Sequence, residues 1–386
     1  MCGIIGILGK DKVADDMVEA LRRLEYRGYD SAGIATIHDD RLDRRRAVGK
    51  LKALEGVLST EPLDGRAGIG HTRWATHGQP TTANAHPHIT KRIALVHNGI
   101  IENFRELKEE LAQHNITPEG QTDSEIIALL FDLMLSQSDD ITDTFRRFLA
   151  RLEGAFALGI LVHGQADMLL AARRGSPLVL GVGDGESYLG SDAIALASLT
   201  NRVIYLEEGD WAVLRRENIT IFDETGVCVE RAVHTTQASG ALVDKGNYRH
   251  FMLKEIFEQP TVFGQTISQY LDPTRGGLNM PALPFDLASI SRVTIIACGT
   301  AYYAGCVARY WFEQIAGIAA ETDIASEFRY RAPVMDPNGL VVFVSQSGET
   351  ADTLSALRLS KEMGLKTLVV VNVPESSMER EADVRL

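Results

Sequence analysis

Cys2 is the residue of this chain whose type and position first indicate covalent chemistry. If Met1 is removed, Cys2 becomes the terminal residue and its α-amine lies beside its own thiol. The reference pKa of an α-amine is about 8, so a fraction of the amine is unprotonated near neutral pH and can act as a general base. We therefore predict a nucleophile that needs no histidine, although position alone fits an ordinary small core residue equally well.

If such a nucleophile opens the side-chain amide of an amino acid through a thioester, three further groups are needed. These are oxyanion donors, a guanidinium for the α-carboxylate and a carboxylate for the α-ammonium. The sequence offers Asn98-Gly99 after the apolar run 92–97, Arg73 within HTRWATHG, and Asp123 at a predicted helix start. Each residue also has an ordinary reading: a turn for Asn98-Gly99, a surface charge for Arg73 and a helix N-terminal residue for Asp123.

Two loops in the second half of the chain suit an anion. Residues 298–300 and 345–350 each follow an apolar run and open a predicted helix. A helix N-terminus offers unpaired N–H groups and the positive end of a dipole, and ligands of parallel sheets bind at the carboxyl ends of strands. Helix capping explains Thr300 alone better, whereas the run SQSGET at 345–350 favours a phosphate site.

The elements that must position Cys2 begin with a buried strand at residues 2–8. A helix follows at 13–24, with Val13, Met17 and Leu21 on one face at helical spacing. Strands and helices that occur in separate clusters favour an α+β layered domain. Further strands are predicted at residues 32–37, 93–97, 155–162, 168–172 and 203–206, and further helices at residues 102–113 and 123–135.

The pattern changes after residue 233. The polar, glycine-containing segment 234–247 predicts a linker, and the helical stretch from 248 is expected to stop at Pro260. Apolar strands then alternate with amphipathic helices, which indicates a doubly wound parallel sheet. The chain ends soon after the last of these strands, so we expect a truncated sheet. The strands are predicted at residues 293–297, 320–324, 340–344 and 367–371, and the helices at residues 301–315 and 350–363.

Length and composition limit the function classes. A chain of 386 residues favours two domains, and its 45% apolar and 24% charged residues are typical of a soluble globular protein. The net charge of −13 argues against a nucleic-acid partner, because phosphate neutralisation needs a basic face. A small anionic substrate needs no more than a local pocket, so it remains compatible with this charge.

Cysteine and histidine usage points away from metals and disulfides. The spacing of Cys2, Cys228, Cys298 and Cys306 fits neither a zinc site nor a disulfide framework, which favours a reducing compartment. We expect no signal peptide, no membrane span and a cytoplasmic location, because apolar runs fall short of the ~18 residues that a span needs. No metal and no cofactor is predicted from the histidines, which lack a helical HxxxH pair or a cysteine partner. They are His71, His77, His86, His88 and His97.

Several motifs in the first half occur together in a specific order. They are MCGI, RGYDSAG (27–33), GHTRWATHG (70–78), NAHPH (84–88), HNGIIEN (97–103) and TDSE (122–125). This set resembles the class II glutamine amidotransferases, the group with an N-terminal nucleophile. The resemblance implies that residues 2–233 form a glutaminase domain folded as an N-terminal-nucleophile αββα sandwich. The motifs reinforce one another because each alone would be weak.

The resemblance also assigns roles to the candidate residues. It implies that Cys2 is the nucleophile and, through its amine, the base. The Asn98 side chain and the Gly99 N–H would form the oxyanion hole. Arg73 would bind the α-carboxylate of L-glutamine, and Asp123 its ammonium group.

Three neighbours of Arg73 complete the implied site. Thr76 and His77 would line the glutamine pocket, and Trp74 would lie at the exit to an ammonia channel. A channel is needed because ammonia in neutral water is mostly ammonium, which is no nucleophile. Trp74 also fits the ordinary role of a packed aromatic residue.

The second half resembles a sugar isomerase (SIS) domain through ACGTAYYAG (297–305), ASEFRYR (325–331) and SQSGETADT (345–353). The resemblance implies a first, truncated copy at residues 248–386 after a linker at 234–247. Ala301 departs from the family, which often has a serine there. The residues implied to bind the sugar phosphate are Thr300, Ser345, Gln346, Ser347 and Thr350.

The order of the two halves resembles an amidotransferase family that transfers nitrogen from L-glutamine to D-fructose 6-phosphate. That family forms homodimers through its sugar isomerase domains and has a second such domain and a C-terminal tail. We therefore expect this chain to retain the glutaminase half of the activity. An alternative is a phosphoribosyl amidotransferase, which would show a phosphoribosyl-pyrophosphate loop in place of SQSGET. A third is a non-enzymatic sugar-phosphate sensor, against which the retained site residues count.

Overall fold

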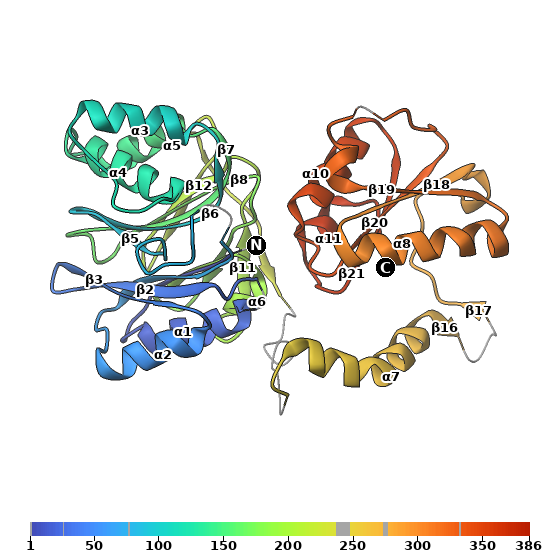
Figure 1. Ribbon diagram of the computed structural model, residues 1–386, viewed down its shortest axis with the longest axis horizontal. Coiled ribbons are helices and arrows are strands. Elements are labelled where there is room, and N and C mark those ends of the chain that lie inside the picture. The colour runs from blue at the N-terminus through green and yellow to red at the C-terminus, as the bar shows by residue number, and fades with distance from the viewer. Residues whose placement is uncertain (1, 26, 76–77, 237–247, 273–276, 332) are drawn as a thin grey trace. The chain divides into compact units, whose positions relative to one another are not determined.

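The computed structural model comprises two compact units, Met1–Asp244 and Lys245–Leu386. Each unit has its own hydrogen-bonded sheets (Figure 1). The structure describes residues 2–25, 27–75, 78–236, 248–272, 277–331 and 333–386.

The first sheet of unit 1 has eight strands in the order β15-β11-β9-β10-β1-β4-β2-β3. Strand β1 lies inside the sheet, and its two neighbours, β4 and β10, pair with it antiparallel. A strand with partners on both sides is held firmly, which suits the strand that follows the candidate nucleophile. The strands are β1 (Gly3–Leu8), β2 (Ser31–His38), β3 (Arg41–Val48), β4 (Ala67–Arg73), β9 (Val179–Val182), β10 (Ser187–Gly190), β11 (Arg202–Tyr205) and β15 (Val233–Thr235).

The second sheet of unit 1 has seven strands in the order β14-β13-β12-β8-β7-β6-β5. Strand β6 pairs with β7 over its whole length, in antiparallel register. The strands are β5 (His88–Ile89), β6 (Ile93–Ile101), β7 (Gly154–Val162), β8 (Leu169–Arg174), β12 (Trp211–Leu214), β13 (Ile219–Phe222) and β14 (Cys228–Val229).

Helices cover the outer face of each sheet (Figure 1). Helices α1 (Ala14–Leu24), α2 (Leu51–Thr60) and α6 (Ala193–Leu196) lie against the first sheet. Helices α3 (Phe104–Gln113), α4 (Asp123–Leu135) and α5 (Ile141–Leu149) lie against the second. The result is a four-layered αββα sandwich, as the sequence predicts.

Three buried apolar clusters correspond to the three interfaces between these layers. Ile5 packs with Leu21 under the first sheet, Ile4 packs in the cluster between the two sheets, and Leu95 packs with Phe131 under the second sheet. Because successive side chains of a strand point to opposite faces, Ile4 and Ile5 of one strand serve two different cores.

The same alternation explains the glycines of β4. A Cβ at Gly68 would lie 2.5 Å from the Met17 sulfur, and one at Gly70 would lie 2.9 Å from Ile5, so α1 packs closely on this face. The residues between and after them, Ile69 and His71, point to the interior between the sheets. Glycine on one face thus allows close helix packing, while the other face carries functional side chains.

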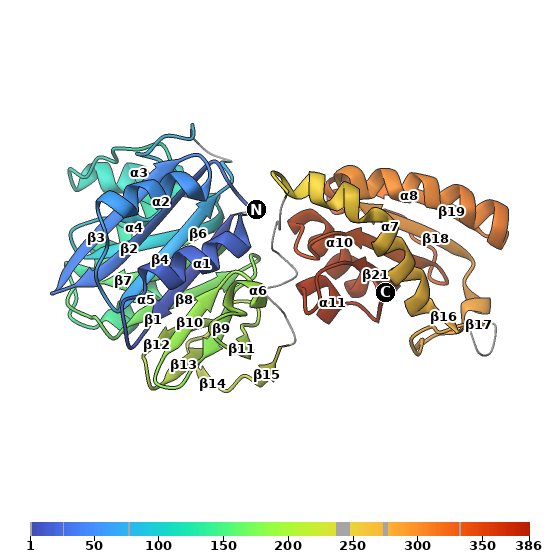
Figure 2. The same ribbon diagram turned by 90° about the horizontal axis from the view of Figure 1, so that it is seen from below.

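Unit 2 contains a five-stranded, parallel sheet in the order β19-β18-β20-β21-β22. Apolar clusters lie on both of its faces, one with Phe312 and Ala308 and the other with Phe328 and Leu357, so the sheet is doubly wound (Figure 2). The elements are β18 (Arg292–Ala297), α8 (Gly299–Trp311), η3 (Phe312–Ala316), β19 (Ala319–Ile324), α9 (Ala325–Phe328), β20 (Leu340–Ser345), α10 (Ala351–Glu362), β21 (Lys366–Val371), α11 (Ser377–Glu381) and β22 (Val384–Arg385).

The strand order of unit 2 reverses at β18. The chain moves from β18 to β19 on one side and then returns to β20 on the other. Loops that leave the carboxyl ends of two such strands diverge and form a crevice, which is where ligands of doubly wound sheets bind. The two predicted phosphate loops follow β18 and β20, the strands on either side of this switch point.

Unit 2 also corrects one sequence-based expectation. The predicted helix stop at Pro260 is wrong, because α7 (Phe251–Tyr270) continues through it. A proline removes one hydrogen bond and disturbs the preceding turn, but the turns on either side remain bonded. Unit 2 further contains β16 (Leu271–Asp272), β17 (Gly277–Leu278) and η2 (Leu287–Ser289).

The predicted linker at 234–247 falls mostly outside the described residues, which stop at 236 and resume at 248. His234 and Thr235, its first two residues, belong to β15 and pair with β11. Among the helices that the structure describes, none combines the length and apolar character that a bilayer crossing requires.

Candidate active site

Cys2 lies at the start of β1, where the register pairs Gly3 with Thr72 of β4. The main-chain N–H of Trp74 donates to the Cys2 sulfur at 3.2 Å, and the thiol lies 3.4 Å from the Trp74 oxygen. Burial raises the pKa of the Cys2 thiol, while the Trp74 N–H and the nearby Arg73 charge lower it. The protonated thiol is therefore favoured, and a base is needed to make it a nucleophile.

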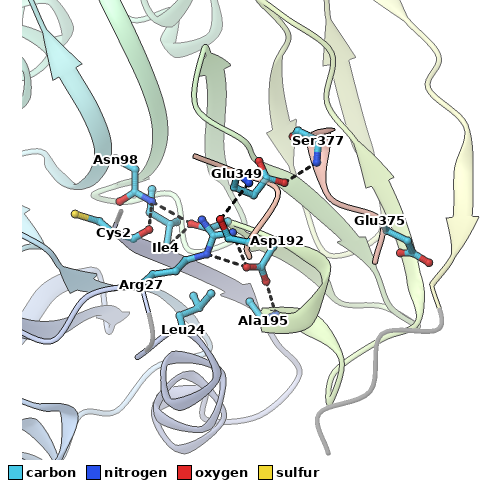
Figure 3. Close-up of polar contacts among 12 residues, drawn as sticks. Cys2, Ile4, Leu24, Arg27, Asn98, Asp192, Ala195, Glu349, Glu375 and Ser377 are labelled. Atoms are coloured by element: carbon cyan, nitrogen blue, oxygen red, sulfur yellow. Dashed lines mark hydrogen bonds and ion pairs between the residues drawn. The ribbon is translucent and has the colours of Figure 1, made fainter. Parts of the chain in front are cut away.

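Asn98 comes from the second sheet and reaches the same point. Its Nδ2 donates to the main-chain oxygen of Cys2 at 2.9 Å and to Ser191 Oγ at 3.0 Å (Figure 3). Ser191 Oγ also accepts the N–H of Ile4 at 2.8 Å, so it links the amide to β1. The Asn98 amide is thus fixed beside the candidate nucleophile by groups from two sheets.

Gly99 shows why the turn reading of Asn98-Gly99 is wrong. Strand β6 continues through both residues to Ile101, paired with β7 throughout. Gly99 has φ +137° and a Cβ there would lie 2.0 Å from the Ala155 oxygen, so any side chain would collide with β7. The strand is distorted at this residue without ending, which requires glycine.

Arg73 ends β4 and is 3% exposed. Its Nη1 and Nη2 donate to the main-chain oxygens of Gln79 and Gly78, both at 3.3 Å. Burial lowers the pKa of Arg73, and the charges of Cys2, Asp30 and Asp123 oppose that shift. The guanidinium is still a cation at neutral pH, because arginine is not deprotonated there.

Asp123 opens α4 and is 6% exposed. Its two carboxylate oxygens accept the N–H groups of Ile101 and Ser124, each at 2.9 Å. Thr122 caps the N-terminus of this helix, because its Oγ1 accepts the N–H of Glu125. A fixed carboxylate at the end of β6 suits an ammonium ligand, since its geometry is set before binding.

The motif 27–33 packs against the main chain of residues 73–75, which borders this site. Gly28 packs so closely that a Cβ would lie 2.6 Å from the Arg73 carbonyl carbon and 2.8 Å from the Trp74 nitrogen. Asp30 Oδ2 accepts the N–H of Ala75 at 2.8 Å. Arg27 forms a buried ion pair with Asp192, at 2.7 Å (Figure 3). The motif therefore holds the main chain that donates to the Cys2 sulfur.

Trp74 is 44% exposed and its ring meets that of Tyr29 edge-on, with centroids 5.6 Å apart. An aromatic pair at the rim of the site is compatible with the predicted exit position. Thr76 and His77, which the sequence predicts to line the glutamine pocket, lie outside the described residues.

Four histidines cluster between the sheets and beside α4. His71, His86, His88 and His97 are all buried, and burial lowers the pKa of each. The His71 and His86 ring centroids are 4.1 Å apart, and those of His86 and His88 are 4.8 Å apart. Within the described ranges, no group of histidine, cysteine, aspartate or glutamate residues has an arrangement that could hold a metal ion.

The two predicted phosphate loops lie at the same edge of the unit 2 sheet. The register pairs Ala297 with Val344, so both loops start one residue later, side by side. Thr353 Oγ1, in the first turn of α10 after the second loop, donates to Cys298 Sγ of the first loop at 3.8 Å. Thr300, which begins α8 after Gly299, is exposed at this edge.

Hydroxyl groups organise the second loop. Ser345 Oγ accepts the N–H of Gly348 at 3.1 Å, and Ser347 Oγ accepts the N–H of Glu349 at 3.2 Å. The Thr350 and Ser345 hydroxyls are 3.2 Å apart. Gln346 is the exposed residue of the loop. The loop is thus curled ahead of α10, and the first N–H groups of a helix favour an anion.

Sequence reasoning missed two residues of the site, His71 and Ser191. His71 Nε2 lies 2.9 Å from Asn98 Oδ1 and 3.2 Å from the His97 oxygen. His71 lies in the HTRWATHG motif, two residues before Arg73. Because residues two apart on a strand point to the same face, this spacing was a signal that His71 lies on the same face of β4 as Arg73. Ser191 follows β10 far along the chain, and nothing in its local sequence marks it.

The matches to family models define the class of protein. Residues 71–198 match the glutamine amidotransferase domain, and residues 286–386 match the SIS domain. With the αββα sandwich and the doubly wound sheet, these matches define the chain as a glutamine amidotransferase joined to a SIS domain.

Curated relatives within this class are similar to the chain over its whole length. A glutamine–fructose-6-phosphate aminotransferase (isomerizing) of Zymomonas mobilis is 58% identical over the whole of this chain. One of Bradyrhizobium diazoefficiens is 55% identical, also over the whole chain. The chain covers 64% of the length of each of these relatives. Over its whole length, the chain is therefore similar to part of the glutamine–fructose-6-phosphate aminotransferases.

Solved structures support the fold. The glutamine phosphoribosylpyrophosphate amidotransferase of B. subtilis has a TM-score of 0.52 at 16% identity, with 100% of this chain and 90% of that chain covered. At such identity the similarity concerns the fold alone. The SIS match in the second half distinguishes this chain from the phosphoribosyl alternative considered above.

Proposed function

We propose that this chain carries the glutamine-hydrolysing part, and one sugar-binding part, of an enzyme that transfers the amide nitrogen of L-glutamine to D-fructose 6-phosphate. The products are D-glucosamine 6-phosphate and L-glutamate. The observation that carries the proposal is the position of Cys2, with its sulfur 3.2 Å from the Trp74 nitrogen and its main-chain oxygen bonded to the Asn98 amide.

The chemistry begins with proton transfer within one residue. With Met1 removed, the free amine of Cys2 takes the thiol proton and the sulfur attacks the side-chain carbonyl of glutamine. The tetrahedral oxyanion is stabilised by the Asn98 amide and the Gly99 N–H. The amine returns the proton to the departing nitrogen, ammonia leaves, and a thioester forms. Water then attacks this thioester and releases glutamate and the free thiol.

Arg73 and Asp123 select the amino-acid end of the substrate. The buried guanidinium binds the α-carboxylate, and the fixed carboxylate binds the α-ammonium group. Thr76 and His77 are proposed to complete the pocket, and Trp74 to line the route of ammonia. Exclusion of water along that route keeps the product as ammonia, which is the nucleophilic form.

The sugar phosphate is proposed to bind at the switch point of the unit 2 sheet. The loop 345–350 offers serine and threonine hydroxyls ahead of the first N–H groups of α10, and Thr300 offers a hydroxyl at the adjacent strand end. The residues proposed to bind are Thr300, Ser345, Gln346, Ser347 and Thr350.

Complete transfer is expected to need the part of the relatives that this chain does not cover, since the chain spans 64% of their length. We propose the domain limits 2–233 and 248–386, a homodimer through the sugar isomerase domains in the full-length enzyme, and a cytoplasmic location. No cofactor is required by this chemistry, because a thioester and an ammonia acceptor suffice.

A paired assay tests the proposal. The purified chain, with Met1 removal verified by mass, is incubated with glutamine and fructose 6-phosphate, and glutamate and glucosamine 6-phosphate are measured in the same samples. We expect glutamate release and little glucosamine 6-phosphate. A chain that starts at Cys2 and releases no glutamate would contradict the proposal.

A further inference from the structure

We infer that His71 is a positioning residue for glutamine hydrolysis: its Nε2–H fixes the Asn98 side chain so that the amide NH2 group faces Cys2. This inference rests on the proposed function, and it adds a residue whose role is separate from nucleophile, base and substrate binding. It concerns the orientation of one amide, which has two nearly isosteric ends.

The contacts determine which nitrogen of His71 carries the proton. Nε2 lies 2.9 Å from Asn98 Oδ1 and 3.2 Å from the His97 oxygen. A carbonyl oxygen only accepts, so Nε2 must be the donor in a bond shared between them. Among the described residues, nothing lies within hydrogen-bond reach of His71 Nδ1, which suits the unprotonated nitrogen of a neutral ring.

The opposite orientation of the amide would be unfavourable at both ends. Reversal would place Oδ1 at the position of Nδ2, which is 2.9 Å from the Cys2 oxygen. Two carbonyl oxygens would then face each other, and the NH2 group would face the Nε2–H of His71. The donor from His71 therefore selects the orientation in which NH2 points to Cys2.

The position of His71 is itself fixed by the fold. Strand β4 pairs His71 with Ile4 of β1 on one side and with Gly33 of β2 on the other. The side chain is fully buried, and the His86 ring packs against it. Burial lowers the pKa of His71 to about 3, and the nearby charges of His97 and Arg73 act in the same direction. The ring thus stays neutral and keeps one donor over the working pH range.

Preorganised donors stabilise an oxyanion because they need no reorientation during the reaction. An amide that can rotate would spend part of its time with oxygen toward the developing negative charge. Loss of the His71 donor should therefore lower the rate of the chemical step more than it affects glutamine binding, which uses Arg73 and Asp123.

Three substitutions at one position separate the donor from the packing. His71→Gln keeps an N–H donor at nearly the reach of Nε2, His71→Asn carries the same amide one carbon shorter, and His71→Leu keeps the volume without a donor. We expect kcat for glutamate release to fall about 10- to 100-fold in the Leu and Asn variants, with KM changed less than about threefold. The Gln variant should recover most of the rate.

A double-mutant cycle tests whether His71 acts through Asn98. Asn98→Ala removes the amide, so adding His71→Leu to it should cause no further loss of kcat. Losses that multiply would overturn the inference, as would equal activity of the Gln and Leu variants. Alkylation of Cys2 by iodoacetamide, which forms no oxyanion, should proceed at the wild-type rate in every variant that keeps the wild-type melting temperature. A parallel fall in alkylation would indicate general damage and overturn the inference.

A measurement on the unsubstituted chain covers the case in which the variants do not fold. Nitrogen-15 NMR of the histidine-labelled protein, with the His71 ring assigned through its own backbone signals, should show this ring neutral, protonated at Nε2 and unchanged between pH 8 and pH 5. A ring protonated at Nδ1, or one that titrates in this interval, would overturn the inference. If the wild-type chain releases no glutamate while its ring has the expected tautomer, the proposed function has failed and not the geometry.

Discussion

At the scale of single residues, the site combines groups that carry the chemistry with groups that hold them. Cys2 is held by the Trp74 N–H, and Asn98 is held by its contacts to Cys2, Ser191 and His71. Burial raises the pKa of the Cys2 thiol, so the proposed reaction depends on a base that removes the thiol proton.

Arg73→Lys should weaken glutamine binding. A guanidinium can form two parallel bonds with a carboxylate, whereas an ammonium is a point charge, and charge-assisted bonds contribute about 1.5–3 kcal/mol each. Because about 1.4 kcal/mol of binding free energy corresponds to a tenfold change in affinity, we expect KM for glutamine to rise about tenfold or more. Steady-state kinetics of glutamate release provide the measurement. Arg92→Lys, in an ion pair with Asp132, is the matched control, and an unchanged KM in Arg73→Lys would refute the role.

The residues proposed to carry chemistry were candidates from the sequence alone, whereas the residues that the structure shows in contact with them were not. Cys2, Arg73 and Asp123 are recognisable because their types are unusual for their positions. His71 and Ser191 act through hydrogen bonds to Asn98, and those bonds depend on how strands of two different sheets face each other. Residue spacing along one strand contains no information on that arrangement.

At the scale of elements, alternation along β4 and β6 decides which side chains meet. His71 of β4 and Asn98 of β6 both point to the interior between the sheets, whereas His97 of β6 points to α4 and lies 2.9 Å from Ser124 Oγ. A shift of either strand by one residue would turn these side chains to the opposite face. The register of two strands therefore sets the site.

Gly99→Ala should abolish measurable glutaminase activity and destabilise unit 1. A Cβ at this residue would lie 2.0 Å from the Ala155 oxygen, which belongs to the paired strand and cannot move freely. Gly164→Ala is the matched control, because Gly164 also has positive φ, at +76°, but has nothing within 4 Å of a Cβ. We expect the control to cost about 1 kcal/mol and to keep its activity. Equal melting temperatures of the two variants would contradict this account.

The buried histidines should make unit 1 sensitive to mild acid. The folded pKa of His71 is lowered to about 3, below its unfolded value, so the unfolded state binds a proton that the folded state does not. The free energy of unfolding has its full value above pH ~6.5. It falls as the pH drops toward 3, by about 1.4 kcal/mol per pH unit for each such histidine. Urea unfolding at pH 7.5 and pH 5 measures the loss, which should be about 2 kcal/mol smaller in His71→Gln. An equal loss in both proteins would be inconsistent with the buried neutral ring.

Elements with a regular apolar pattern were predictable, and elements adapted to a neighbour were not. The four strands and two helices predicted for the sheet of unit 2 agree with the structure to within a few residues. Strand β4 has no apolar pattern because α1 requires glycine on one face, and β3 is largely polar because it is an edge strand of the sheet. Proline usually ends a helix, so the continuation of α7 through Pro260 was not predictable from the sequence.

At the scale of the whole molecule, two units with separate cores carry two separate sites. The apolar clusters of unit 1 contain no residue of unit 2, and the reverse also holds for the residues described. The fold class of each unit could be predicted from motif order and strand pattern. The pairing of strands within unit 1 could not be predicted, because many strands that pair with each other there are distant in the sequence.

The two sites should fail independently. Cys2→Ala is expected to abolish glutamate release, at least 1,000-fold by the usual effect of losing a nucleophile, while fructose 6-phosphate binding measured by calorimetry stays at the wild-type value. Gly348→Ala should do the reverse, because Gly348 has φ +64° and a Cβ would lie 2.4 Å from the Ser376 Cβ. Loss of sugar-phosphate binding in Cys2→Ala would show that the sites are coupled.

The position of Cys2, the proposed nucleophile, directly before β1 also determines how the protein can be produced and fused. An affinity tag or reporter attached ahead of Cys2 would convert its α-nitrogen into a planar amide, which has no basic lone pair. Such a fusion would fold, because β1 begins at Gly3, and yet be inert. Under the proposed mechanism, a methionine aminopeptidase must therefore remove Met1 before the folded chain can hydrolyse glutamine.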